Sequence, residues 1–510
     1  MAHTTLLRKT GDRADMIESG QGASAPSRPT APTMVRVLTC GSVDDGKSTL
    51  IGRLLWDAAV IPDDTRATIA ASAGPDGVPD VSLLLDGLEA ERSQGITIDI
   101  AWRYFDVARR RYVIIDCPGH EQYTRNMATG ASQADIAIML LDVRQGLKPQ
   151  TRRHAAILQL VGIRQVILAV NKMDLVDWSE SAFKSIARDF AELAARSGFK
   201  AATAIPVAGR LGDNIATRSE RLRWFKGPTL LTALEAATAR LETQALPFRM
   251  PVQWVARTAK DFRGLAGTIT SGSIAVGDEI VEVLSGRSAR VSRIVTFAGD
   301  HSNAQAGKAV TVALDRDLDI ARGGVLAAPD RPAQAARNIE CRLVWLADHG
   351  PGQGGLLLRT STDLVPVSSF GVRARLDLQT LETQKSATCG PNDIADVRIG
   401  LGRTVALDTF VDNPGTGRFV LVDALSGATV AGGVVTAIAG AAATGTGNAF
   451  RLTRSLLAST VCADLPRFAS ADVEFRRRTA EVAFLMSAAG VSVDLDGFDD
   501  ETGEDGGSGI

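Results

Sequence analysis

Five short, continuous apolar runs, spaced between residues 34 and 207, constrain how this chain folds more than any other feature. Segments with helical apolar spacing separate them. Strands that are apolar on both faces and alternate with helices form a parallel sheet with helices on both sides. The sequence therefore predicts an α/β domain with a mostly parallel, doubly wound sheet. The runs are VRVLT, YVIID, IAIMLLDV, QVILAVN and ATAIPV.

The rest of the chain differs in composition. After Pro247, short β-branched runs are punctuated by Gly, which predicts two successive antiparallel β-barrel domains. Both ends are polar and rich in small residues, which is typical of disordered tails. We expect these parts: 1–33, N-terminal tail; 34–245, α/β domain; 246–332, first barrel; 333–438, second barrel; 439–494, linker and a C-terminal segment; 495–510, acidic tail.

The loop after the first apolar run contains G-x-x-x-x-G-K-S, from Gly41 to Ser48. It lies between a strand and a predicted helix, the context in which this spacing holds phosphate oxygens on backbone N–H groups. Gly41 and Gly46 allow the close backbone approach, and Lys47 can reach the β- and γ-phosphates. The Ser48 hydroxyl can bind Mg²⁺.

Two positions in this loop carry carboxylates, Asp44 and Asp45. Because backbone N–H groups and a lysine hold the phosphates, these carboxylates need not face a nucleotide. We expect them to point toward the loop's own amides or toward a neighbouring switch segment.

A second loop, D-C-P-G-H, follows the YVIID run and begins at Asp116. The Asp116 carboxylate is placed to hold the water shell of Mg²⁺, and the Gly119 N–H can sense a γ-phosphate. An ordinary strand-end turn is the alternative. His120 follows directly, where its side chain could orient an attacking water, although a lone histidine is more often a packed or surface residue.

A third loop, N-K-M-D, follows the QVILAVN run and spans residues 171–174. Guanine presents an N1–H and an exocyclic amine side by side, and the Asp174 carboxylate can accept from both. Asn171 can bond near the imidazole edge and the loop, and the Lys172 stem can lie over the base. Three such loops in this order favour a GTP site over chance turns.

Thr97 lies between the first two loops, in ERSQGITID. A threonine on a mobile loop can bind Mg²⁺ and let the γ-phosphate control the order of that loop, although it could be an ordinary strand threonine. We predict Lys47, Thr97 and His120 as catalytic residues. Ser48, Thr97 and, through water, Asp116 are the predicted Mg²⁺ ligands.

Charge and cysteine usage limit the alternatives. The formal net charge is −2, so no broad basic surface for nucleic acid is expected. Five cysteines are scattered without metal-ligand spacing, and the N-terminus lacks a signal-peptide core, which favours a cytoplasmic protein. Residues 424–450 are uncharged but mostly Gly, Ala and Thr, so we expect a strand and a linker rather than a membrane span.

Together these residues resemble translational-type GTPases, the class of elongation factor Tu. RGLAGTITSGSIAVGDEI resembles that class's second-domain signature, so the likeness extends into the barrels. It implies a switch I threonine at Thr97, a catalytic histidine at His120, and an apolar gate from Val43 and Ile96. The implied GTP-binding residues are Gly41, Ser42, Val43, Asp44, Asp45, Gly46, Lys47, Ser48, Thr49, Asp116, Cys117, Pro118, Gly119, His120, Asn171, Lys172, Met173, Asp174, Ala208 and Gly209.

Within this class, GSVDDGKSTLIGRLLWD, ERSQGITIDIAWRYF and DCPGHEQYTRNMATGASQAD resemble the GTPase large subunit of bacterial sulfate adenylyltransferase. Elongation factors typically have His at the position of Asp45. The resemblance implies the cofactors GTP and Mg²⁺ and a small catalytic partner subunit that adenylates sulfate with ATP. GTP hydrolysis would be coupled to the partner's formation of adenosine 5′-phosphosulfate and pyrophosphate. An elongation-factor-like role in translation and a non-catalytic scaffold are the alternatives.

Two departures from the family pattern concern the last guanine loop and the C-terminus. Ala208 and Gly209 stand where the family has Ser and Ala; the N–H that meets the guanine carbonyl is kept, but a supporting hydroxyl is lost. VCADLPRFASADVEFRRRTAEVAFLMSAAGVSV resembles part of adenylylsulfate kinase, but no second G-x-x-x-x-G-K-S follows Ser48. We expect a kinase remnant without kinase activity, and an unrelated amphipathic helix is the alternative.

Overall fold

The computed structural model describes most of the chain from β1 to the second barrel and two short strands near the C-terminus. The described residues are 33–58, 61–74, 77–85, 97, 99–107, 110–237, 241–258, 262–351, 355–439, 450–453 and 493–496. The expected N-terminal and acidic tails lie outside this set. So do Ile96 and nearly all of the kinase-like segment.

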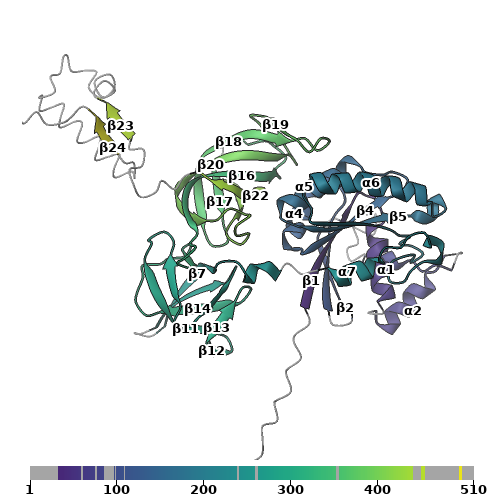
Figure 1. The fold of residues 1–510 in the computed structure, drawn as a ribbon, viewed down its shortest axis with the longest axis horizontal. Helices are drawn as coiled ribbons and strands as arrows, with labels where there is room; N and C mark the ends of the chain where they lie inside the picture. The colour runs from purple at the N-terminus through teal and green to yellow at the C-terminus, as the bar shows by residue number, and fades with distance from the viewer. Residues whose placement is uncertain are drawn as a thin grey trace, which may run out of the picture.

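The first part of the chain forms a six-stranded sheet in the order β2-β3-β1-β4-β5-β6 (Figure 1). β1 pairs in parallel with β3 and β4, so the loops that follow these three strands leave the same edge of the sheet. The predicted mostly parallel sheet is confirmed. The apolar runs do not predict β2, an antiparallel edge strand whose residues are partly exposed. The strands are β1 (Thr33–Gly41), β2 (Ala101–Val107), β3 (Arg110–Asp116), β4 (Ile136–Asp142), β5 (Gln165–Asn171) and β6 (Ala201–Pro206).

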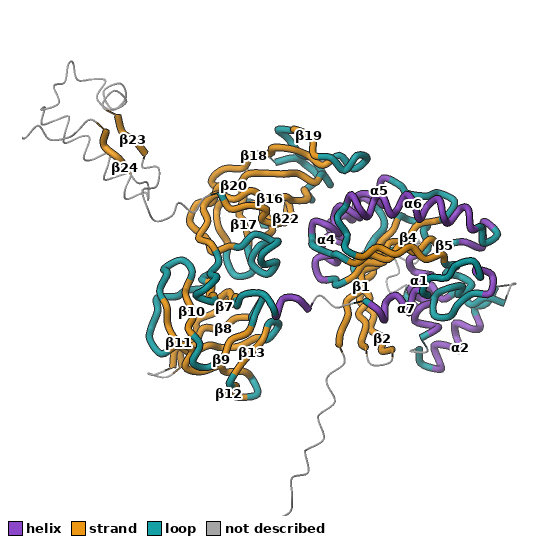
Figure 2. Tube along the Cα trace, viewed as in Figure 1, coloured by secondary structure: helices purple, strands orange, loops and turns teal. Residues whose placement is uncertain are grey.

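Helices cover both faces of this sheet, as Figure 2 shows. Alternate β1 residues face opposite cores: Val35 and Val37 pack with α1 and α7, whereas Leu38 and Cys40 pack on the side of α4, α5 and α6. The α-helices are α1 (Lys47–Asp57), α2 (Asp63–Ala71), α4 (Thr124–Gln133), α5 (Pro149–Leu160), α6 (Glu180–Arg196) and α7 (Leu230–Ala236). The short 3-10 helices are η1 (Val81–Leu84), η2 (Glu121–Tyr123), η3 (Met173–Val176), η4 (Glu220–Leu222) and η5 (Leu241–Gln244).

The next part is an antiparallel barrel of six strands, closed by the pairing of β10 with both β15 and β11. Closure removes the exposed edges that an open sheet would present. The barrel strands are β7 (Arg249–Thr258), β8 (Phe262–Thr268), β14 (Ala309–Leu314), β11 (Ser288–Thr296), β10 (Glu279–Glu282) and β15 (Val325–Ala327). β12 (Gly299–His301) pairs antiparallel with the end of β11, and β9 (Ser273–Ala275) pairs with β13 (Asn303–Gln305).

A second six-stranded antiparallel barrel follows and closes through the pairing of β17 with both β21 and β18. Its strands are β16 (Gln334–Trp345), β20 (Ile394–Leu407), β18 (Leu364–Leu376), β17 (Leu356–Arg359), β21 (Arg418–Asp423) and β22 (Thr429–Ile438), with β19 (Thr383–Lys385) added to β18. The two predicted barrels are therefore confirmed. Two further strands, β23 (Phe450–Thr453) and β24 (Val493–Asp496), pair in parallel.

The second barrel packs directly on the α/β domain. Val344, Ile394 and Val434 of the barrel belong to the same apolar core as residues of α4 and α5. Arg125 of α4 donates to the carbonyl oxygens of Leu346 (3.5 Å) and Thr429 (3.1 Å). The helix that follows the D-C-P-G-H loop is thus in contact with the barrel.

The uncharged run at residues 424–450 was expected to form a strand and a linker rather than a membrane span. Its first half forms β22, as expected, and residues 440–449 lie outside the described set. In the part of the chain that the structure describes, no helix is long and apolar enough to cross a membrane.

Candidate nucleotide site

Three of the predicted loops meet around one cavity at the carboxyl edge of the sheet. The cavity has a volume of about 380 Å³. Its position outside the ends of parallel strands is where open α/β sheets bind ligands. The lining residues are Val43, Asp44, Gly46, Lys47, Ser48, Thr49, Ser82, Leu85, Thr97, Ala101, Asp116, Gly119 and Lys172. Ser82, Leu85 and Ala101 belong to no nucleotide-binding motif, so the sequence does not predict their place in this lining.

The first loop has the backbone conformation that a phosphate site requires. Gly46 has φ of 92°, and a Cβ there would lie 2.6 Å from the Asn171 amide nitrogen, so glycine is needed at this position. Asp44 also has positive φ, at 65°, which Asp tolerates better than most residues. Gly46 caps α1 without a side chain, so the first N–H groups of the helix are left for an anion.

Lys47 is buried and folded back on its own loop. Its Nζ donates to the carbonyl oxygens of Gly41 (3.2 Å) and Ser42 (3.0 Å). Burial lowers the pKa of the Lys47 ammonium, and the neighbouring carboxylates of Asp116 and Asp45 oppose this shift. A cation held among carbonyl oxygens at the floor of a cavity is suited to a phosphate.

Gly119 lies against this lysine. A Cβ built on Gly119 would be 2.4 Å from Lys47 Nζ and 2.5 Å from the Gly41 carbonyl oxygen. Because real Cβ atoms do not approach other atoms so closely, the contact requires glycine. The D-C-P-G-H loop therefore touches the phosphate loop directly.

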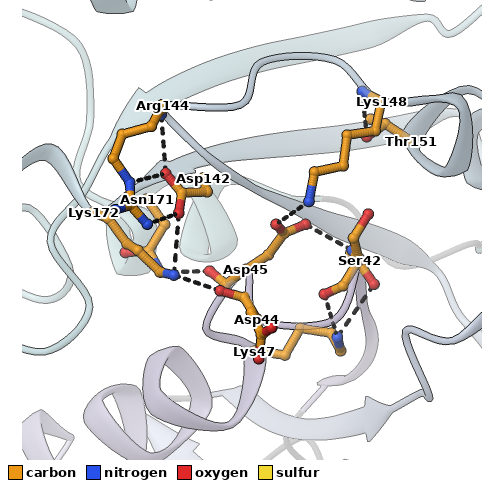
Figure 3. Close-up of polar contacts among 11 residues, drawn as sticks. Ser42, Asp44, Asp45, Lys47, Asp142, Arg144, Lys148, Thr151, Asn171 and Lys172 are labelled. Atoms are coloured by element: carbon orange, nitrogen blue, oxygen red, sulfur yellow. Dashed lines mark hydrogen bonds and ion pairs between the residues drawn. The ribbon is translucent and has the colours of Figure 1, made fainter.

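Asp45 turns into its own loop rather than into the cavity (Figure 3). Its side chain is 1% exposed, and Oδ2 accepts a hydrogen bond from the Ser42 N–H at 2.7 Å. Oδ1 lies 3.3 Å from Lys148 Nζ. Burial raises the pKa of the Asp45 carboxyl above its usual value, while Lys148 and the Ser42 N–H oppose that shift. The expectation that a carboxylate here bonds to the loop's own amides is confirmed for Asp45, whereas Asp44 is exposed and lines the cavity.

The N-K-M-D segment is joined to the first loop by its own side chains. Asn171 is buried, and its Nδ2 donates to the Asp45 carbonyl oxygen at 2.8 Å. Lys172 donates to the Asp44 carbonyl oxygen and is one of the residues that line the cavity. Met173 is buried, whereas Asp174 is partly exposed in η3.

The last guanine loop, at Ala208 and Gly209, keeps its backbone N–H groups, and both of them are bonded within the protein. Gly209 N–H donates to Asn171 Oδ1 at 2.9 Å, and Ala208 N–H donates to the Asp213 carbonyl oxygen at 3.3 Å. Both residues are buried, and a buried N–H must find an acceptor within the protein. The amide oxygen of Asn171 is therefore bonded to this loop instead of facing outward.

An ion-pair network beside the N-K-M-D segment was not expected from the sequence. The fully buried Asp142 carboxylate, at the end of β4, accepts from Arg144 Nη2 (2.6 Å) and lies 3.1 Å from Lys172 Nζ (Figure 3). Burial raises the pKa of Asp142, but these bonds outweigh it and hold that pKa well below its usual range. The sequence signal that could have indicated this network is the position of Asp142, a carboxylate at the end of a central parallel strand.

Three oxygen-bearing side chains meet at the cavity where Mg²⁺ is expected. Ser48, Thr97 and Asp116 all line it, and Asp116 Oδ1 accepts from Thr39 Oγ1 at 3.0 Å. No cluster of three His, Cys, Asp or Glu side chains able to hold a metal occurs among the described residues. Hydroxyls and one carboxylate fit a Mg²⁺ that takes its remaining oxygens from phosphates and water.

His120 lies beside the cavity but faces solvent. It is exposed, and its Nδ1 accepts from the Gln122 N–H at 3.3 Å, which caps η2. It is not among the described residues that line the cavity, although its neighbour Gly119 is. Cys117 and Pro118 are buried, and burial raises the pKa of the Cys117 thiol. The His120 ring would have to rotate toward the cavity to act there.

Family comparisons agree with this geometry. Residues 32–243 match the family model of the elongation factor Tu GTP binding domain. Residues 338–436 match the model described as GTP-eEF1A C-terminal domain-like. Fold, cavity and matches define a GTP-binding chain of the elongation factor type, with the GTP-binding domain at its start.

Within this class, the chain is most informatively compared with individual relatives. The chain is 44% identical over 414 residues to sulfate adenylyltransferase subunit 1 of Methylorubrum populi, covering 80% of this chain and 88% of that protein. It is 44% identical over 426 residues to the same subunit of Rhizobium tropici, covering 81% and 85%. The chain belongs to the sulfate adenylyltransferase subunit 1 family. It is also 45% identical over 409 residues to the bifunctional enzyme NodQ of Rhizobium sp. strain N33, of which it spans only 63%, against 79% of itself.

Proposed function

We propose that this chain is the GTP-hydrolysing large subunit of a sulfate adenylyltransferase. In this proposal, a small catalytic partner subunit forms adenosine 5′-phosphosulfate and pyrophosphate from ATP and sulfate, and GTP hydrolysis drives that uphill reaction. The observation that carries the proposal is the single cavity shared by the phosphate loop, Thr97, Asp116 and Gly119 in a chain of this family. The similarity to sulfate adenylyltransferase subunit 1 along most of both chains favours this role over the alternative role in translation.

The contacts of the site support specific roles in binding. The N–H groups at the start of α1 and the Lys47 ammonium hold the phosphates. Asp174 reads the N1–H and amine of guanine, and the Lys172 stem, fixed at its tip by Asp142, covers the base. The carbonyl of Asp45 is held by Asn171, which keeps the guanine loop and the phosphate loop in register.

Hydrolysis is assigned to residues around the γ-phosphate position. Lys47 stabilises charge on the transferring phosphoryl group, and His120 turns inward to orient the attacking water. Val43, which lines the cavity, is the described half of the proposed apolar gate beside the histidine. Ser48, Thr97 and, through water, Asp116 would hold Mg²⁺, which would neutralise charge at the phosphates.

The second barrel offers a route from the nucleotide to the partner. Glu121, next to His120, is ion-paired to Arg153 of α5 at 2.9 Å, and its carbonyl oxygen accepts from Asn392 of the barrel at 3.5 Å. Arg125, one turn later, holds two barrel carbonyl oxygens. A movement of Gly119 toward a γ-phosphate would strain these bonds. We propose that the barrel transmits this change to the partner subunit.

The activity is assigned to the cytoplasm. Four of the cysteines, Cys40, Cys117, Cys341 and Cys389, are free and buried, as in a protein of a reducing compartment.

The test is co-expression with a small sulfate-adenylating subunit, followed by measurement of sulfate-dependent pyrophosphate release with and without GTP. The proposal requires co-purification of the two chains and a faster release with GTP. Release that is identical with GTP, GDP and no guanine nucleotide would refute the coupling. A parallel reaction without sulfate measures the pyrophosphate released by unrelated ATP hydrolysis and serves as the control.

A further inference from the structure

Lys148 is the residue before α5 and reaches the phosphate loop from across the sheet edge. Its side chain is 25% exposed, yet Nζ lies 3.3 Å from Oδ1 of Asp45, which is 103 positions earlier in the chain. The backbone of Lys148 is fixed as well, because its N–H donates to Thr151 Oγ1 at 3.3 Å. The ammonium is thus presented by a fixed helix start rather than by a free loop.

Asp45 needs a cationic partner at this position. A buried carboxylate without one carries a large desolvation cost, and the Ser42 N–H satisfies only one of its two oxygens. The pKa of the Asp45 carboxyl is raised by burial, and Lys148 is the leading group that opposes this shift. Lys148 is therefore the main compensation for a negative charge set inside a phosphate loop.

The other cations near the loop are already engaged. Lys172 and Arg144 are bonded to Asp142, and Lys172 also donates to the Asp44 carbonyl oxygen (Figure 3). Lys47 donates to two loop carbonyl oxygens and faces the phosphate position. None of these described bonds joins a cation directly to the Asp45 carboxylate, as the bond from Lys148 does.

We propose that Lys148 is a positioning residue for the nucleotide loop: its ion pair holds Asp45 against the Ser42 amide and cancels a charge that would otherwise repel the phosphates. The pair keeps the backbone of the loop in the shape that Asn171 clamps through the Asp45 carbonyl oxygen. Loss of the pair leaves a carboxylate free to turn toward the cavity. Its effect grows with ligand charge, so GTP is affected more than GDP. This inference rests on the proposed guanine-nucleotide site and not on coupling to sulfate.

Variants at Lys148 and Asp45 separate the effect of the ion-pair charges from the effect of side-chain packing. Lys148→Met removes the ammonium and keeps an unbranched stem, whereas Lys148→Arg keeps the charge. Asp45→Asn removes the carboxylate charge and keeps an acceptor for the Ser42 N–H, and the double variant Asp45→Asn with Lys148→Met leaves no unpaired charge. Lys184→Met is the matched control, because Lys184 forms an exposed pair with Glu180 on α6.

The measurement is binding and dissociation of fluorescent GTP and GDP analogues on the full-length chain, with the thermal midpoint recorded for each variant. Lys148→Met should weaken GTP binding by about 10- to 100-fold, the range for one lost hydrogen bond to a charged group, and GDP binding less. The double variant should bind within about threefold of Asp45→Asn alone. Lys148→Arg and Lys184→Met should bind as the unchanged chain does.

Three results would overturn the proposal: unchanged GTP binding by Lys148→Met, equal losses for GTP and GDP, or a double variant no better than Lys148→Met. If Lys148→Met does not fold, the folded double variant still provides the comparison, because it must bind as Asp45→Asn does. Failure of the unchanged chain to bind any guanine nucleotide would instead refute the proposed site, so the two failures are distinguishable.

Discussion

Replacement of Arg249 by Met should loosen the contact between the two barrels. Arg249, at the start of β7, donates from Nε and Nη2 to the two oxygens of Asp408 at 2.9 and 3.0 Å. The two side chains are only 3% and 8% exposed, and Thr416 also donates to Asp408. The pair is therefore a fully bonded, two-point ion pair inside the interface.

The cost follows from what Arg249→Met leaves behind. The methionine keeps much of the stem packing, but Asp408 retains its charge with one hydroxyl donor. Breaking one side of a buried pair costs about 3–5 kcal/mol, because the remaining charge is uncompensated. Arg249→Met with Asp408→Asn removes both charges and keeps an acceptor for Thr416, so it should recover about 1–3 kcal/mol of that loss.

Urea unfolding followed by tryptophan fluorescence measures this effect, because Trp345 in the second barrel is buried at 1% exposure. The account predicts a lower unfolding midpoint for Arg249→Met and partial recovery in the double variant. A loss below about 1 kcal/mol would refute the reasoning, since that is the range of exposed pairs. Replacement of Arg293, whose pair with Asp300 is half-exposed, is the matched control.

The remaining predictions concern the nucleotide site. Asp174→Asn should weaken GTP binding roughly 100-fold or more and favour xanthosine triphosphate, measured by competition; retained guanine preference would contradict the assignment. His120→Ala should keep GTP binding and lose roughly 10²–10⁴-fold in hydrolysis, and unchanged turnover would exclude it from the mechanism. Gly119→Ala should lower hydrolysis roughly 100-fold, because its Cβ would lie 2.5 Å from the Gly41 carbonyl oxygen; single-turnover hydrolysis checks this. Burial lowers the pKa of His154 to about 3, below its usual 6.5, so its contribution to stability is lost as pH falls from 6.5 toward 3. His154→Asn should flatten the pH dependence of unfolding by up to about 1.4 kcal/mol per pH unit, and an unchanged slope would contradict the assignment.

Local patterns predict much of this fold. Continuous apolar runs identify β1, β3, β4 and β5, because these strands are mostly buried on both faces. The run ATAIPV identifies β6 as well, although only the last two residues of that strand are buried. The edge strand β2 escapes this reasoning, since Trp102 and Tyr104 on it are exposed and only Phe105 is buried deeply. Edge strands carry a weaker apolar signal for this reason.

Some residues of the candidate site can likewise be predicted from the sequence, and others cannot. Motif spacing predicts that Lys47, Ser48 and Asp116 lie together, and all three line the cavity. Lys47 and Ser48 begin α1 after the loop that follows β1, Asp116 ends β3, and these two strands are neighbours in the sheet. Asp142 and Lys148 lie outside any motif, and their contacts depend on which strand neighbours β1. Long-range ion pairs of this kind follow from tertiary packing, which spacing along the chain does not encode.

The central claim is that GTP hydrolysis drives sulfate adenylation, and the accumulation of adenosine 5′-phosphosulfate tests it most directly. The purified complex of this chain with the proposed small subunit is supplied with ATP, sulfate and either GTP or a non-hydrolysable GTP analogue. The account predicts that the final concentration of adenosine 5′-phosphosulfate rises above its GTP-free equilibrium only with GTP and in proportion to the GTP consumed. The same final concentration with GTP, with the analogue and without either would contradict it.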